Sequence, residues 1–175
     1  MGLNNVNVES MQAFAAEVER DPNAGRKSKK VVGEWNFKDG EPQFRATMEF
    51  PAGTQVTECD FLPPMGGRGL RPDPVQYCLY GFAACFASTY AAVAAAENVP
   101  LKKLRVAIEN RLDLSRALGV SDRVPIEDVV LTLEVEADAP KAKLEELRRA
   151  AEDRCPGVYC MTNPIPLTTR LGAIG

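Results

Sequence analysis

The chain has 175 residues, a length that suits one compact domain with a sizeable core. Its 21 basic and 24 acidic side chains give a net charge of −3, which excludes the broad basic surface of a nucleic-acid-binding protein. The chain contains no histidine, so Ser-His-Asp and Cys-His catalysis and histidine-containing metal sites are excluded. Cysteine, arginine and carboxylates remain as the candidates for chemistry.

The first third of the chain predicts a helix followed by a sheet. Apolar side chains at helical spacing over residues 7–19 indicate a short amphipathic helix. Residues 31–59 alternate between apolar and polar side chains around an Asp-Gly hairpin signal, which predicts an antiparallel meander. Residues 63–69, rich in glycine and proline, form a loop. We expect a single domain over residues 1–175, with residues 1–25 as an N-terminal helical extension.

The most distinctive stretch is residues 75–96, which carries no charge and is rich in alanine and aromatic side chains. Asp73 can cap a helix and Pro74 suits its first turn, so the stretch predicts a helix about 35 Å long. A helix that is apolar all round must be buried, in protein or in lipid. Its length would allow a membrane span, but the many alanines and the polar Ser88 and Thr89 favour a buried core helix. No membrane association is expected.

The second half of the chain predicts two strands and a helix. Aliphatic side chains alternate with charged ones over residues 104–114 and again over 129–136, so two antiparallel strands are expected, each with one buried face. Asp138 is a candidate cap for the following helix, which ends at Cys155. Residues 158–171 contain two prolines and predict an extended edge strand. This order of elements indicates an α+β domain with helices packed on antiparallel sheets.

The chain has five cysteines, which are Cys59, Cys78, Cys85, Cys155 and Cys160. The first twenty residues show no secretory signal, which predicts a cytoplasmic protein whose thiols stay reduced. A four-cysteine zinc site fits the spacings poorly. Burial as small hydrophobic side chains is the simple expectation for Cys59, Cys78 and Cys160. Cys78 and Cys85 are seven residues apart on one helix, too distant for a disulfide.

Three segments resemble the OsmC/Ohr family in consistent order. Residues 73–77 (Asp-Pro-Val-Gln-Tyr) and 81–86 (Gly-Phe-Ala-Ala-Cys-Phe) are similar to the family's central-helix signature. Residues 112–120 match the segment after that helix, and residues 154–164, with Arg-Cys-Pro and Asn-Pro, match its second cysteine region. The likeness covers residues 66–167, and two cysteine motifs in register make it specific.

This resemblance implies an OsmC-like fold, in which antiparallel sheets wrap a long buried central helix within an intertwined homodimer. It also implies a thiol peroxidase of organic hydroperoxides that needs no metal or organic cofactor. By the same resemblance, Cys85 is the nucleophile, Cys155 is the resolving cysteine, and an external dithiol is the reductant. A second hypothesis is an OsmC-fold protein without turnover that binds a small apolar ligand in the interface pocket.

A buried nucleophilic cysteine needs a cation beside it, because burial alone raises the pKa of a thiol. The candidates are arginines from the meander and the following loop: Arg45, Arg68 and Arg71. Arg45 is preferred because a residue on a strand points to one fixed face of the sheet. The better peroxidases of the family hold this arginine with a glutamate after the helix-initiating proline, where this chain has Val75. Glu58 and Asp60 are the possible substitutes.

Overall fold

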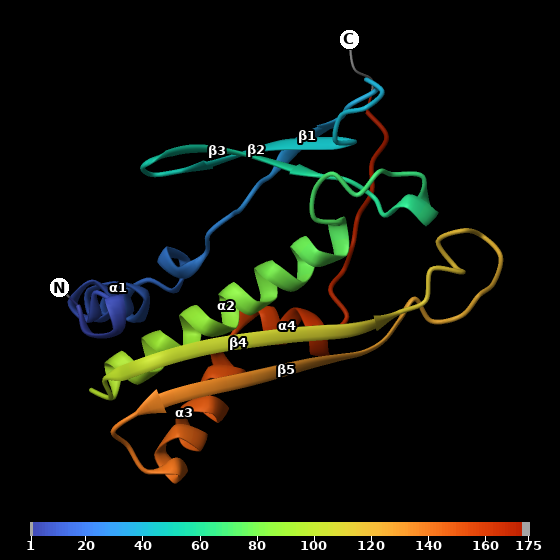
Figure 1. Cartoon of the computed structure of the whole chain (residues 1–175). Helices are drawn as coiled ribbons and strands as arrows, with labels where there is room; N and C mark the ends of the chain where they lie inside the picture. The colour runs from blue at the N-terminus through green and yellow to red at the C-terminus, as the bar shows by residue number, and fades with distance from the viewer. Residues whose placement is uncertain (1, 173–175) are drawn as a thin grey trace.

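The central helix α2 spans Pro74–Ala96 in a computed structural model that describes residues 2–172 (Figure 1). Its start is a complete capping box, because the Asp73 carboxylate accepts from the backbone N–H groups of Val75 and Gln76. In return, the Gln76 side chain accepts from the Asp73 N–H at 3.0 Å. The helix predicted from the uncharged stretch is therefore confirmed, and local side chains determine where it begins.

Within residues 2–172, five strands form two separate antiparallel sheets, as the alternation of side chains predicts. A meander joins strands β1 (Val32–Trp35), β2 (Phe44–Phe50) and β3 (Gly53–Cys59). The long strands β4 (Leu101–Leu112) and β5 (Ile126–Ala137) pair with each other. Figure 1 shows β4 and β5 running along one side of α2, while the β1–β3 sheet lies on the other side.

The core forms where α2 packs against β4, β5 and helix α3 (Lys141–Arg154). Its buried side chains come from α2, α3 and the residues that follow these two helices: Phe86, Tyr90, Val93, Ala94, Val99, Leu147, Ala151 and Cys155. Partly buried aliphatic side chains of β4 and β5 close it from the sheet side. The core is thus centred on the C-terminal half of α2, and Cys155 belongs to it.

One face of α2 stays uncovered, contrary to the prediction of a helix buried all round. Tyr80 is 71% exposed and Cys78 is exposed. The reason is that β4, β5 and α3 cover one side only, and the β1–β3 sheet makes at most marginal contact with other elements of residues 2–172. By length and composition α2 could also cross a membrane. This is weak evidence for a membrane span, because core helices of soluble proteins meet the same criterion.

The C-terminal region corrects two predictions. Residues 156–162 form the short helix α4 (Pro156–Thr162) rather than an edge strand, and no strand follows in the described residues up to 172. Pro156 occupies the first turn, where a missing N–H costs nothing, and so starts a new helix after α3. Asp138 does not cap α3, since Pro140 holds that position and Asp138 pairs with Lys102.

The N-terminal segment adds helix α1 (Val8–Arg20), which confirms the predicted amphipathic helix, although none of its residues is buried. It is attached to the core through a short helical turn at Leu3–Asn5. The Asn4 side chain donates to the Val99 carbonyl at 2.9 Å and accepts from the Leu101 N–H at 2.8 Å. One amide side chain therefore holds the N-terminus against the start of β4.

Candidate active site

Cys85 and Cys155 lie together although 70 residues separate them in the chain. Their Sγ atoms are 3.5 Å apart, and both side chains are free thiols. Cys85 sits in the middle of α2, whereas Cys155 is the residue between α3 and α4. A disulfide needs sulfur atoms about 2 Å apart, so a small side-chain movement would join them.

The two thiols differ in their access to solvent. Cys155 is only 1% exposed and packs in the core beside Leu147 and Ala151. Cys85 is half-buried and contacts the same cluster from its edge. A reagent from solution would therefore reach Cys85 first, while Cys155 is placed to react only with Cys85.

Gly157 allows α4 to approach α2 at this point. A Cβ atom on Gly157 would lie 2.8 Å from Phe82 Cδ2 and 3.4 Å from Cys85 Cβ, which is too close for the first contact without a shift. The absence of a side chain thus sets the separation of the two helices beside the thiols. Sequence reasoning missed this residue; a glycine directly after a Cys-Pro helix start is the signal that could have found it.

The thiol of Cys85 is not activated within the single chain. Burial raises the pKa of Cys85 above its ordinary value, and the neighbouring Cys155 and Cys160 thiols raise it further. A hydrogen bond from the Gly157 backbone N–H lowers this pKa but does not outweigh burial. Among the described residues, the groups that act most strongly on the pKa of Cys85 include no cation. A thiolate at neutral pH therefore requires a positive charge from elsewhere.

The predicted cation, Arg45, lies on β2 and is held by Glu58 on β3. The two residues are direct partners in the strand register, and Arg45 Nε and Nη2 donate to Glu58 Oε1 at 3.0 and 2.6 Å. Arg71 Nε donates to the other oxygen of Glu58 at 3.0 Å. The paired arginines, Arg45 foremost, lower the pKa of Glu58. The structure brings Arg45 and Arg71 together around one carboxylate, but does not bring them to Cys85.

Of the two predicted substitutes for a carboxylate at position 75, Glu58 pairs with Arg45 and Asp60 does not. Asp60 is buried and accepts backbone N–H groups of Arg68 and Leu70, so it organises the loop instead. The Arg68 guanidinium turns to Asp39. Glu58 is in addition tied to the central helix, because Tyr77 Oη donates to its backbone carbonyl at 2.7 Å.

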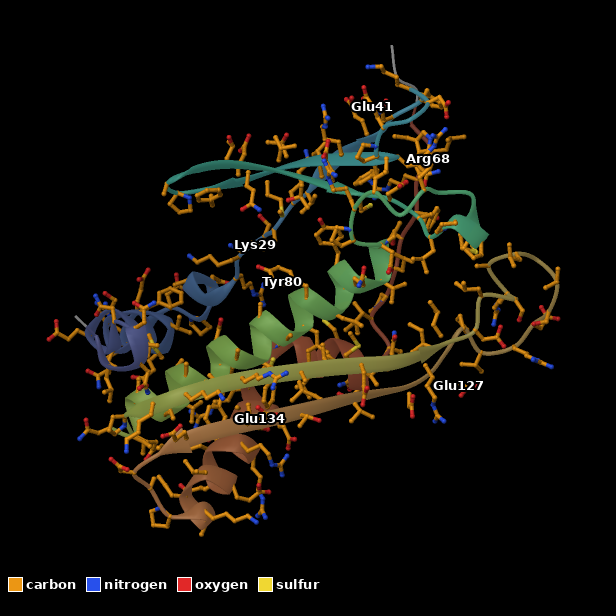
Figure 2. All side chains as sticks on the ribbon, in the orientation of Figure 1. Lys29, Glu41, Arg68, Tyr80, Glu127 and Glu134 are labelled. Carbon is orange, nitrogen blue, oxygen red and sulfur yellow. The ribbon has the colours of Figure 1, made fainter. Side chains whose placement is uncertain are left out.

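A cavity of about 1230 Å³ separates the β1–β3 sheet from the N-terminal half of α2. Figure 2 shows Tyr80 on the side of α2 that faces this sheet. The lining is largely apolar, with Glu58 and Arg71 among its polar members; its aromatic and sulfur-containing residues are Trp35, Phe44, Met48, Cys59, Phe61, Tyr77 and Tyr80. The cavity is large enough for a ligand with a sizeable apolar part.

The remaining cysteines depart from the expectation of burial. Cys78 and Cys160 are exposed, and only Cys59 is partly covered. Cys78 is exposed because the uncovered face of α2 carries it. Cys160 is exposed because α4 turns residues 157 and 158 inward and leaves this position outside. The exposure of Cys78 and Cys160 could not be predicted without knowing which helix faces are covered.

Comparison with known proteins identifies the family. A model of the family described as OsmC-like protein matches residues 67–170, more than half of the chain. The chain belongs to the OsmC-like family. The match includes α2 with Cys85 and the α3–α4 junction with Cys155, and it leaves α1 and the β1–β3 sheet outside. Among curated proteins, the search found no match.

Solved OsmC-like structures confirm the α+β fold around the long helix. An OsmC-like protein from Mycoplasma pneumoniae is 18% identical, with a TM-score of 0.59 over 77% of this chain and 87% of that one. An organic hydroperoxide resistance protein OsmC from Legionella pneumophila is 18% identical, with a TM-score of 0.55 over 78% and 92%. An OsmC-like protein of unknown function from Vibrio cholerae is 16% identical, with a TM-score of 0.56 over 77% and 93%. These identities establish the fold alone.

Gly157→Ala tests how far the OsmC-like site depends on the close approach of α4. The new methyl group would displace α4 from Phe82 and move Cys155 relative to Cys85. We expect disulfide formation between them to slow on the order of tenfold, since misplacing reacting groups by an ångström can cost about 100-fold. The measurement is the rate of thiol loss after adding diamide, a dithiol oxidant, followed by timed alkylation.

Gly81→Ala is the matched control for this substitution. Gly81 also lies on α2, but nothing stands within 4 Å of an added Cβ. The Gly81→Ala substitution is expected to leave the rate of disulfide formation unchanged and to stabilise α2 slightly. Equal rates in the parent and Gly157→Ala proteins would contradict a role for the close helix approach.

Proposed function

We propose that this OsmC-like protein is a thiol-dependent peroxidase that reduces organic hydroperoxides. The observation that carries the proposal is the 3.5 Å separation of Cys85 and Cys155, one thiol half-buried at the protein surface and the other enclosed in the core. The name of the Legionella pneumophila structure, an organic hydroperoxide resistance protein, supports the same class of substrate. The chain acts as a single domain with residues 1–25 as an extension.

The proposed reaction uses only protein thiols and an external dithiol. The Cys85 thiolate attacks the O–O bond of the hydroperoxide, forms a sulfenic acid and releases an alcohol. The Cys155 thiol then condenses with the sulfenic acid, forming a disulfide and releasing water. An external dithiol reduces this disulfide and becomes a disulfide itself. The contact between the two sulfur atoms supports the condensation step because it needs little rearrangement.

Arg45 is proposed to supply the missing positive charge within a homodimer in the cytoplasm. Three observations support this arrangement: α2 has an uncovered face, the β1–β3 sheet makes few contacts with the other helices and strands in residues 2–172, and a cavity lies between the sheet and α2. A second copy that covers α2 would bring charged groups to the half-buried Cys85. Glu58 would hold the Arg45 guanidinium in one orientation, as it does in the single chain.

The test is mass spectrometry of the reduced protein after one equivalent of cumene hydroperoxide. The expected product has lost two hydrogens, and non-reducing digestion maps a single disulfide to Cys85 and Cys155. Oxidation that is absent, or that is spread evenly over Cys59, Cys78 and Cys160, would rule out peroxidase function. Size-exclusion chromatography with light scattering on the same sample reports whether the protein is a dimer.

The alternative is a protein without turnover that binds a small apolar ligand in the cavity. Two observations favour it: the cavity of about 1230 Å³ and the raised pKa of Cys85 in the single chain. Binding of an apolar fluorescent probe, lost on Tyr80→Ser, together with an absence of peroxide-driven oxidation would support this function instead. Tyr80 lines the cavity and lies away from the core cluster, so its replacement leaves folding intact.

A further inference from the structure

Arg71 lies in the loop before α2 and is the second arginine that binds Glu58. Its Nε donates to Glu58 Oε2 at 3.0 Å, whereas Arg45 Nε and Nη2 donate to Oε1 at 3.0 and 2.6 Å. Hydrogen bonds between charged groups are about twice as strong as neutral ones. The two arginines therefore fix both oxygens of one carboxylate, and the three side chains form an ion cluster, termed the Glu58 cluster.

The backbone on both sides of Arg71 is held in place by Asp60. This residue is 1% exposed, and its Oδ2 accepts from the backbone N–H groups of Arg68 and Leu70 at 3.1 and 2.9 Å. The Asp60 N–H in turn donates to the Pro72 carbonyl at 3.4 Å. Because Asp60 directly follows β3, these bonds keep the loop that carries Arg71 beside the end of that strand.

The Glu58 cluster presents its two guanidinium groups outward. The exposed fraction of the side chain is 59% for Arg45 and 49% for Arg71, but only 17% for Glu58. The carboxylate is thus enclosed between its partners, while both arginines remain open to a second copy of the chain. Arg71 and Glu58 also line the cavity that borders the uncovered face of α2.

Arg71 changes the charge that this cluster offers to a nearby thiol. Arginine is always protonated in proteins, and the two arginines, Arg45 foremost, lower the pKa of Glu58, so the carboxylate is ionised at neutral pH. Without Arg71, the full negative charge of Glu58 would oppose the positive charge of Arg45. Of the neighbouring carboxylates, Glu41 pairs with a lysine and Asp60 is bound by backbone N–H groups. Arg71 therefore makes the cluster more positive by one charge.

We propose that Arg71 is a positioning residue that holds Glu58 and adds the positive charge with which the Glu58 cluster stabilises the Cys85 thiolate. This role rests on the proposed peroxidase function, because it concerns the activation of the nucleophile in that reaction. It follows from the origin of the carboxylate on β3, since the loop that carries Arg71 is anchored at the end of this strand. The other arginine of the loop has no such role, because the Arg68 guanidinium pairs with Asp39.

The experiment measures how fast iodoacetamide, a neutral reagent that reacts with thiolates, alkylates Cys85 in the full chain as the pH is varied. Peptide mass mapping separates Cys85 from the other cysteines. Arg71→Gln keeps a hydrogen-bond donor but removes the charge, so alkylation at neutral pH should slow about fivefold, because a nearby opposite charge favours the ionised form. The pKa of Cys85 rises in this variant, so its rate should increase at a higher pH than in the parent chain and converge at alkaline pH.

Arg71→Lys keeps the charge and is expected to restore most of the parent rate and the parent pH profile. A merely structural role of the arginine would leave the lysine and glutamine variants equally impaired. The other titratable groups that act on the pKa of Cys85 in the single chain, the Cys155 and Cys160 thiols, are the same in all variants.

Arg68→Gln is the matched control, since Arg68 is an exposed arginine of the same loop and its backbone N–H to Asp60 is unaffected. It is expected to show the parent profile. Superimposable profiles for the Arg71→Gln and parent proteins, or equal displacement of the Arg71→Gln and Arg71→Lys profiles, would overturn the role of Arg71. If Arg71→Gln shifts the alkylation profile but cumene hydroperoxide does not oxidise Cys85, the peroxidase proposal fails separately and the effect of Arg71 on the thiolate stands.

Discussion

Cys155→Ser protein is expected to accumulate a sulfenic acid on Cys85 after one equivalent of cumene hydroperoxide. The nucleophile is intact in this variant, but the thiol that lies 3.5 Å from it is gone, so the reaction stops after the first step. Steady-state peroxide reduction with an external dithiol should fall at least about a thousandfold, as it does when one member of a catalytic unit is removed. Dimedone labelling, mapped by mass spectrometry, measures the trapped intermediate.

Cys85→Ser should lose the same turnover and show no dimedone label. Cys78→Ser is the control for a general effect of removing a thiol from α2, because it is exposed and two turns away from Cys85. It is expected to retain full activity and the Cys85–Cys155 disulfide. If Cys85→Ser is oxidised as fast as the parent chain, the assignment of the nucleophile is wrong.

We expect the Arg45→Ala protein to reduce peroxide about 100-fold more slowly than the parent chain at neutral pH. Its rate should approach the parent rate as the pH rises. In the single chain, burial raises the pKa of Cys85, so the thiol form dominates at neutral pH unless a cation acts on it. An opposite charge within about 4–6 Å typically changes a pKa by one to three units. Removing that charge raises the pKa of Cys85, so the thiolate becomes the main form only at a pH above this raised pKa.

The measurement is the pH dependence of the rate of Cys85 oxidation, followed by stopped-flow. The parent profile should rise at a lower pH than the Arg45→Ala profile, and the two should converge at alkaline pH. Arg105→Ala is the matched control, because Arg105 is also an exposed arginine on a strand and pairs with Glu134. Superimposable profiles for the parent and Arg45→Ala proteins would exclude Arg45 as the activating cation.

Glu58 is the carboxylate that holds Arg45 in this chain, which has Val75 at the position of the family's glutamate. It holds Arg45 and Arg71 through separate oxygens, and Tyr77 on α2 anchors its backbone. We therefore propose that Glu58, on β3, takes the place of the carboxylate that Val75 lacks at the start of α2. Sequence reasoning could offer only Glu58 or Asp60, because both flank Cys59 with similar charge. Only the strand register, which opposes Glu58 to Arg45, separates them.

The sequence by itself determined the elements whose signals are local. Asp73 and Pro74 mark the start of α2, and side-chain alternation marks the strands that pair as β4 and β5. Family resemblance named Cys85 and Cys155 without reference to distance. The sequence pattern could not distinguish α4 from an edge strand, because Pro156 is compatible with either a helix start or an extended segment.

Tertiary structure alone decided which of these elements meet. The packing of α3 and α4 on α2 places Cys155 within 3.5 Å of Cys85, and the missing side chain of Gly157 permits the close approach. It also leaves Cys78 and Cys160 exposed, although their apolar surroundings in the sequence favour burial. Local patterns encode the direction of each face, but whether a face is covered depends on contacts between residues far apart in the chain.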